Sequence, residues 1–228
     1  MRGDDPYTYP YPYQYVLRNR FDIRDVETLD AVERRFAGLR ARGDVPSGNF
    51  DLEHLKAIHR HLFQDVYDWA GETRTVEIWK GETHFQFPQY ISSGMAYVSG
   101  QLEKADYLRN LSPPAFATQA SAIMGDVNYA HPFREGNGRA QLQYLKQLAE
   151  QAGHPLDLRE IDSSRWIAAS QDSYLGSCNP MAMEIGRAIG IADFSGGQPH
   201  TMSPQNEIAP AAEQPSYNMS APPIEQDL

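Results

Sequence analysis

His131-Pro132-Phe133-Arg134-Glu135-Gly136-Asn137-Gly138-Arg139 is the stretch from which the architecture of this chain can be inferred. It holds an imidazole and a carboxylate four residues apart, followed by two glycines that flank an asparagine. Leucines at helical spacing come next, at positions 142, 145 and 148. The pattern predicts a glycine-containing loop that leads into the first turn of a helix.

A loop of this kind favours phosphate chemistry, because the free N–H groups of a helix N-terminus bind anions. Arg139 adds a forked donor for phosphate oxygens. Glu135 is a hard oxygen ligand of the kind that Mg²⁺ takes together with substrate phosphates. His131, beside such an anion, can act as general base for a hydroxyl group at neutral pH. These residues predict phosphoryl or nucleotidyl transfer.

Residues 131–139 resemble the signature of the Fic family, His-Pro-Phe-x-Asp/Glu-Gly-Asn-Gly-Arg-x-x-Arg. The final arginine of that signature falls at Leu142, where this chain departs from it. A second stretch, from Leu55 to Glu72, is similar to the N-terminal half of the family. The similar regions together span residues 7–192, which is most of the chain.

The resemblance implies a mainly α fold, the Fic fold, with about seven helices and a short β-hairpin named the flap. Hydrophobic spacing and capping residues agree, and they predict helices over residues 25–40, 51–66, 88–108, 113–130, 139–151, 163–175 and 180–191. The first of these is expected to bury one face made of Val26, Leu29, Val32, Phe36 and Leu39. Residues 73–87, with several β-branched and aromatic side chains, predict the hairpin.

Composition divides the chain into three parts. Residues 1–20 interleave tyrosine and proline and are expected to form an extended arm laid on the domain. Residues 21–194 are expected to form the Fic domain. Residues 195–228 are rich in Gly, Ser, Gln and Pro and are expected to be disordered, because they cannot bury enough apolar surface to offset the ordering entropy.

Charge and length exclude several classes of function. The 228-residue chain carries a formal net charge of −10, which disfavours direct binding to a nucleic-acid backbone. It has no apolar run long enough to span a membrane. Its single cysteine, Cys178, cannot form an internal disulfide, and no secretory signal precedes the domain. We therefore expect a cytoplasmic protein, with signal-independent export to another cell left open.

The resemblance implies transfer of AMP from ATP, with Mg²⁺, to a Ser, Thr or Tyr hydroxyl of a target protein. It assigns the role of general base to His131 and the role of metal ligand to Glu135. It implies that Gly136, Asn137, Gly138 and Arg139 bind the phosphates. It also implies that Pro132 and Phe133 shape the loop. The flap residues Ile78, Trp79, Lys80 and Gly81 are expected to hold the target segment by strand addition.

Leu142 leaves the donor nucleotide open. In family members the arginine at this place contacts the γ-phosphate, and losing one charge-assisted hydrogen bond costs about 1.5–3 kcal/mol. We expect weaker or less uniform ATP binding, so transfer of UMP, GMP or phosphocholine stays an alternative, as does a catalytically weak binding module. Doc-type relatives transfer the γ-phosphate and carry Lys where this chain has Gly138, which disfavours kinase activity.

Regulation is the last expectation that the resemblance gives. Many Fic proteins inhibit themselves with a Ser/Thr-x-x-x-Glu-Gly/Asn helix, and no stretch of this chain fits that motif. The chain resembles compact bacterial Fic toxins, which implies a separate small antitoxin and a possible target among the type II topoisomerases. Without an arginine at Leu142 the grip of such an antitoxin is expected to be weaker.

Overall fold

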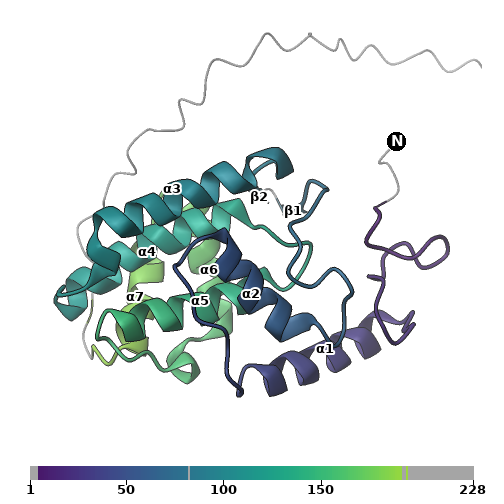
Figure 1. Ribbon diagram of the computed structural model, residues 1–228, viewed down its shortest axis with the longest axis horizontal. Coiled ribbons are helices and arrows are strands. Elements are labelled where there is room, and N and C mark those ends of the chain that lie inside the picture. The colour runs from purple at the N-terminus through teal and green to yellow at the C-terminus, as the bar shows by residue number, and fades with distance from the viewer. Residues whose placement is uncertain (1–4, 82, 192–193, 195–228) are drawn as a thin grey trace, which may run out of the picture.

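The computed structural model describes residues 5–81, 83–191 and 194. This part contains seven α-helices and one two-stranded antiparallel hairpin, which confirms the mainly α prediction (Figure 1). The helices are α1 (Val26–Arg40), α2 (Leu52–Phe63), α3 (Ile91–Lys104), α4 (Pro113–Ala130), α5 (Asn137–Gln151), α6 (Ser163–Tyr174) and α7 (Asn179–Ala188). The predicted tail, residues 195–228, lies outside the described residues.

The hairpin is shorter than the sequence predicted. Strand β1 (Trp79–Lys80) pairs with β2 (Thr83–His84), with Trp79 opposite His84. The remainder of residues 73–87 is irregular, because among its described residues only the Phe85 N–H continues the pairing across the hairpin, to the Ile78 carbonyl at 3.4 Å. The Arg74 and Gln86 N–H groups donate instead to carbonyls at the end of α4 and in the loop after it. A short 3₁₀ turn, Pro88–Tyr90, then leads into α3.

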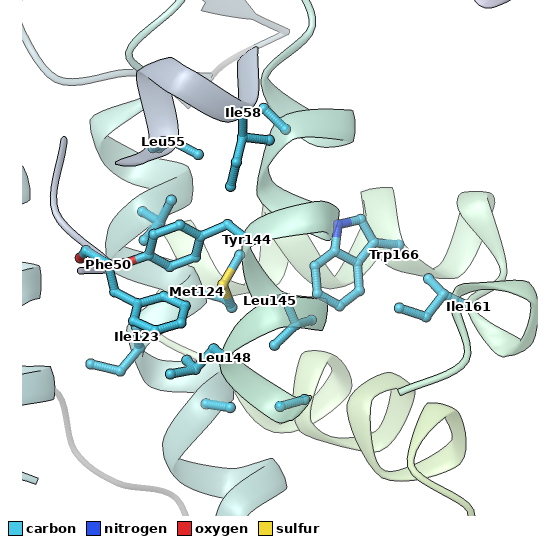
Figure 2. Close-up of a cluster of buried hydrophobic side chains, with 14 of the residues drawn as sticks. Phe50, Leu55, Ile58, Ile123, Met124, Tyr144, Leu145, Leu148, Ile161 and Trp166 are labelled. Atoms are coloured by element: carbon cyan, nitrogen blue, oxygen red, sulfur yellow. Dashed lines mark hydrogen bonds between the residues drawn. The ribbon is translucent and has the colours of Figure 1, made fainter. Parts of the chain in front are cut away.

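Helix α5 lies at the centre of the core. It packs against α2 on one side and α4 on the other, and α4 in turn packs against α3 and α7. Figure 2 shows Tyr144, Leu145 and Leu148 of α5 among side chains of α2, α4 and α6. The Tyr144 hydroxyl donates to the carbonyl of Phe50 at 2.6 Å, so this buried polar group is satisfied. The motif loop therefore joins two helices, α4 and α5, that both pack into the core.

The starts of the helices follow local capping rules. Asp25 and Asp51 cap α1 and α2, each accepting a backbone N–H with its side chain. Helix α6 is capped by Asp162, which accepts the Arg165 N–H at 2.9 Å, and not by Ser163 or Ser164. The predicted helix over 88–108 ends at Lys104, since positive φ angles follow at residues 106–108.

The buried face of α1 differs from the predicted one. Val26 and Leu39 are 42% and 55% exposed, whereas Leu29, Glu33 and Ala37 are buried. The three buried residues recur every four positions, so a glutamate rather than a valine faces the domain. Glu33 is buried because its carboxylate accepts hydrogen bonds from Tyr67 and Arg139, which lie outside α1.

The described part of the N-terminal arm, residues 5–20, packs on the domain. Thr8 and Leu17 form an isolated antiparallel bridge, and Val16 is 1% exposed. Not every ring takes part, because Tyr11 and Tyr15 are exposed. Among the described residues, no helix combines the length and the apolarity that crossing a bilayer requires.

Candidate active site

His131 lies directly after α4, at the position that ends the helix. Its backbone is left-handed, with φ 41° and ψ 62°, which is unusual for a residue with a Cβ. Its N–H still donates to the Val127 carbonyl at 3.2 Å. Such a conformation persists only where neighbouring contacts hold it, and it turns the chain from α4 into the motif loop.

The His131 ring is held in one tautomer. Nδ1 lies 3.1 Å from the Asn128 carbonyl, which can only accept, so Nδ1 carries the proton and Nε2 has the lone pair. The Phe85 ring stacks on the imidazole with centroids 3.7 Å apart. Burial, with the nearby positive charges of Lys80 and Arg74, lowers the pKa of His131 to about 3. The ring is therefore neutral at physiological pH.

Nε2 of His131 is buried and has no hydrogen-bond partner in the part of the chain that the structure describes. An unpaired buried acceptor costs free energy, so natural proteins keep few of them. The stacked Phe85 is one of the groups that cover the ring. A ligand can reach Nε2 only after some of this cover moves.

The motif loop is braced by its own asparagine. The Phe133 N–H donates to Asn137 Oδ1 at 2.9 Å, and Asn137 Nδ2 donates back to the Phe133 carbonyl at 2.7 Å. The Phe133 side chain is fully buried in the core beneath the loop. Since the Asn137 amide is engaged in this way, its expected phosphate contact stays a prediction.

His59 supports the same loop from α2. Its Nδ1 accepts the Gly71 N–H at 2.9 Å, and its Nε2–H donates to the Glu135 carbonyl at 2.9 Å. The ring also stacks on Phe133, with centroids 3.8 Å apart. Burial lowers the pKa of His59 to about 3. His59 is thus a neutral structural residue, and it fixes the backbone of Glu135.

The structure accounts for the two glycines of the motif in different ways. Gly136 caps α5 with φ 80°, and an added Cβ would lie 2.5 Å from the Phe63 ring, so both conformation and space require glycine there. An added Cβ at Gly138 would meet nothing within 4 Å. Gly138 therefore leaves open space at the first turn of α5, where the backbone N–H groups have no acceptor inside the helix.

Arg139 is oriented by α1. Its Nη2 donates to Glu33, which also accepts the hydroxyl proton of Tyr67, and the guanidinium lies over the Phe63 ring at 4.7 Å. Arg139 Nη2 is also 3.9 Å from Oε1 of Glu135. Its Nη1 is buried and finds no hydrogen-bond partner among the described residues. One face of the guanidinium is thus fixed, and one nitrogen is left for a ligand.

A cavity of about 540 Å³ opens beside these residues. Arg134, Glu135 and Arg139 line it from the motif, and Glu33 and Arg34 line it from α1. The volume lies in the range of small-molecule sites. His131 and Leu142 are not among its lining residues, and Leu142 is half-buried against the core.

The flap joins the site through its base rather than its tip. Trp79 is half-exposed and stacks on His84, with centroids 4.5 Å apart. Lys80 is exposed, Ile78 is half-buried, and Gly81 has φ 60° at the turn. Docking of a target segment by these residues stays a prediction. The Pro132 carbonyl accepts the Arg74 N–H at 2.8 Å, which ties the loop to the chain that enters the flap.

Sequence reasoning missed Glu33, Tyr67 and Arg74. A signal for Glu33 existed, because it recurs at spacing four with Leu29 and Ala37. No periodic signal marks Arg74, since its partners are backbone carbonyls, which every residue carries.

Comparison with known proteins agrees with this geometry. The model of the Fic/DOC family matches residues 49–149. The probable protein adenylyltransferase y4lH of Sinorhizobium fredii is 43% identical over 180 residues, which cover 78% of this chain and 94% of that protein. The protein adenylyltransferase VbhT of Bartonella schoenbuchensis is 39% identical over 82% of this chain, but the match covers only 39% of VbhT.

Solved structures show the same fold. The BepC protein of Bartonella tribocorum, crystallised with bound AMPPNP, superposes with a TM-score of 0.74 at 26% identity. The match covers 82% of this chain and 98% of that one. With the motif loop, the flap and the relatives in agreement, the chain belongs to the Fic/DOC family.

Proposed function

We propose that this protein transfers AMP from ATP to a hydroxyl group of a target protein, with His131 as general base. The observation that carries the proposal is Nε2 of His131, a buried lone pair without a partner in the described chain, on a ring whose other nitrogen is fixed. The names of the relatives, and the ATP analogue bound in one structural neighbour, support it.

The residues present fit a magnesium ion held together with the nucleotide. Within the described residues no group of three or more His, Cys, Asp or Glu could hold a metal alone. Glu135 lines the cavity, and its Oε1 accepts the Gly136 N–H at 2.8 Å, which orients the carboxylate. One carboxylate plus substrate phosphates is an ordinary set of Mg²⁺ ligands. When bound, the ion would neutralise phosphate charge.

In the proposed transfer, His131 accepts the proton of the target hydroxyl, and residues of the motif stabilise the charge on the phosphates. The target hydroxyl gives its proton to Nε2 of His131 while its oxygen bonds to the α-phosphorus. The bond from that phosphorus to the β-phosphate oxygen breaks, and pyrophosphate leaves. Arg139 Nη1 and the N-terminal amides of α5 would bind the phosphate oxygens where charge develops. Because Nδ1 is bound to the Asn128 carbonyl, the imidazolium that forms keeps its orientation.

Labelled ATP tests the proposal. Purified protein is incubated with a cell lysate and ATP labelled at either the α- or the γ-phosphate, beside His131→Ala and the control His61→Ala on the same protein. Label in protein from the α position only, lost in His131→Ala and kept in His61→Ala, is the expected result. Label from the γ position would mean phosphoryl transfer. No label from any donor would mean a binding module.

The donor and the target are narrower proposals. Because Leu142 replaces an arginine of the signature, the same assay is run with α-labelled UTP and GTP and with labelled phosphocholine donors. We expect ATP to be preferred. A target among the type II topoisomerases and a small antitoxin partner remain predictions. Loss of supercoiling activity after incubation of a topoisomerase with the protein and ATP would support the first.

A further inference from the structure

Arg74 is a buried cation without a carboxylate partner. It is 2% exposed, and within the described residues no Asp or Glu lies within ion-pair distance of it. Arginine is rarely buried to this degree unless it is paired. Burial lowers the pKa of Arg74 to about 10, so the guanidinium still carries its charge at neutral pH. A charge in this position needs several hydrogen bonds to be tolerated.

Backbone carbonyls supply those hydrogen bonds. Arg74 Nε donates to the His131 carbonyl at 2.8 Å, and Nη1 donates to the Val76 carbonyl at 2.8 Å. Nη2 donates to the Gln86 carbonyl and lies 3.4 Å from that of Ala130. The guanidinium thus binds the two ends of the flap and the residue that carries the imidazole.

These contacts join segments that are far apart in the chain. Val76 and Gln86 are the roots of the flap, on either side of β1 and β2. The Gln86 N–H also donates to the Tyr129 carbonyl at 3.1 Å, next to the end of α4. Phe85, one residue before Gln86, stacks on the His131 ring. The position of the flap roots and the orientation of the imidazole therefore depend on the same side chain.

We propose that Arg74 is a positioning residue that holds the roots of the flap at a fixed place relative to Nε2 of His131. The planar fork of arginine can bind several carbonyls at fixed angles, which the single ammonium of lysine cannot do. The left-handed backbone of His131 is held in part through its carbonyl, which accepts from Arg74. Arg74 has no hydrogen bond to the described residues of the flap tip, 79–81 and 83–84.

The consequence for catalysis rests on the proposed function. A target segment held by the flap has to present its hydroxyl to Nε2, and a misplacement of about 1 Å can cost about a hundredfold in rate. Loss of the Arg74 fork is thus expected to lower kcat for transfer to the target. It is expected to leave the KM for ATP nearly unchanged, because no Arg74 contact reaches the cavity beside Glu135 and Arg139.

The test uses the full chain with Arg74→Lys and Arg74→Ala, and Arg40→Ala as the matched control. Arg40 forms a partly exposed ion pair with Asp65, far from the flap in sequence. Amide hydrogen exchange over residues 76–86 is the readout that does not need turnover. We expect at least tenfold faster exchange there in both Arg74 variants, with exchange in α2 and α5 unchanged, and no such change in Arg40→Ala.

Transfer kinetics and chemical rescue complete the experiment. We expect Arg74→Lys to lose about a hundredfold in kcat at unchanged KM for ATP. Millimolar guanidinium ion should restore part of the activity and of the exchange protection in Arg74→Ala, because it can occupy the vacated space. Wild-type exchange in Arg74→Lys, or an equal rise in every helix, would overturn the positioning role. If the wild type itself transfers nothing, the proposed function fails, and the exchange data still decide the role of Arg74.

Discussion

Nε2 of His131 and Nη1 of Arg139 share an uncommon property in the described structure, since both are buried polar atoms without a protein partner. Most buried polar atoms in folded proteins find one. In both side chains another nitrogen is bound. His131 Nδ1 donates to the Asn128 carbonyl, and Arg139 Nη2 donates to the Glu33 carboxylate. In the proposed function, these two atoms would be the base and a hydrogen-bond donor to phosphate.

Burial of the two imidazoles makes stability depend on pH. His131 and His59 both have their pKa lowered to about 3, against about 6.5 in the unfolded chain. Between these values the unfolded state binds more protons, so stability is full above pH 6.5 and falls as the pH is lowered towards 3. Each histidine contributes about 1.4 kcal/mol per pH unit to this slope.

Urea unfolding of the wild type and of His131→Gln between pH 4 and 7 measures the effect. In the variant, the unfolding free energy is expected to change less steeply with pH, by the contribution of one histidine. This holds whatever the absolute stability of the variant. Equal slopes for the two proteins would show that His131 is not held neutral in the folded state.

Leu142→Arg restores the final arginine of the family signature. Leu142 follows Arg139 by three positions on α5, so a long side chain there points along the same face. One added charge-assisted hydrogen bond is expected to tighten ATP binding by about ten- to hundredfold. Calorimetric titration with ATP is the measurement, and Leu142→Met is the control that keeps the volume and adds no charge. Equal affinities of the wild type and Leu142→Arg would refute the explanation.

At the scale of elements, α1 is a support for the motif as well as a cover for the core. Its buried Glu33 binds Arg139 of α5 and the hydroxyl of Tyr67, which lies after α2. Burial and the adjacent charge of Glu33 raise the pKa of Tyr67, so the phenol remains a donor. Three segments therefore meet at one carboxylate.

Glu33→Gln and Tyr67→Phe, singly and together, test this contact. Removing one partner of a buried hydrogen bond leaves the other unsatisfied, so each single change is expected to cost about 1–3 kcal/mol of unfolding free energy. Because Glu33 and Tyr67 are hydrogen-bonded to each other, the two costs are expected to differ from additive by at least about 0.5 kcal/mol. Urea unfolding gives the values, with the exposed Glu27→Gln as control on the same helix. Additive costs would mean that the carboxylate and the phenol act independently.

At the scale of the whole molecule, the arm reaches the site from the other end of the chain. Asp5 accepts from Arg134 of the motif at 2.9 Å, and the Tyr7 hydroxyl accepts the Thr75 N–H at 3.1 Å. The arm also lines the cavity, through residues 15–17. Residues expected to be only a covering segment therefore contact the motif loop and the entry to the flap.

Deletion of residues 1–17 tests the contribution of the arm. Fully burying a side chain such as that of Val16 is worth about 1.5–3 kcal/mol, so the shortened chain is expected to lose at least about 2 kcal/mol of stability. Thermal and urea denaturation measure the loss. Tyr11→Ser, at an 85% exposed ring, is the control that should change nothing. An unchanged midpoint after the deletion would show that the arm does not stabilise the domain.

Much of the fold was predictable because its signals are local. Asp25 and Asp51 cap the helices that follow them, and the leucines after Arg139 mark the buried face of α5. The seven helices follow from spacing and capping alone, with errors of a few residues at their ends. The buried face of α1 was predicted wrongly, because the spacing of four that links Glu33 to Leu29 and Ala37 does not reveal the partner on another helix that stabilises a buried glutamate.

Nine contiguous residues were enough to predict the loop and the family, because residues 131–139 carry the family signature in one short stretch of chain. Only folding showed what holds them. Arg74 lies 57 positions from His131, and Glu33 lies 106 positions from Arg139. Contacts over such separations leave no pattern in the order of residues, because a carbonyl or a buried carboxylate becomes a partner only when packing brings the segments together.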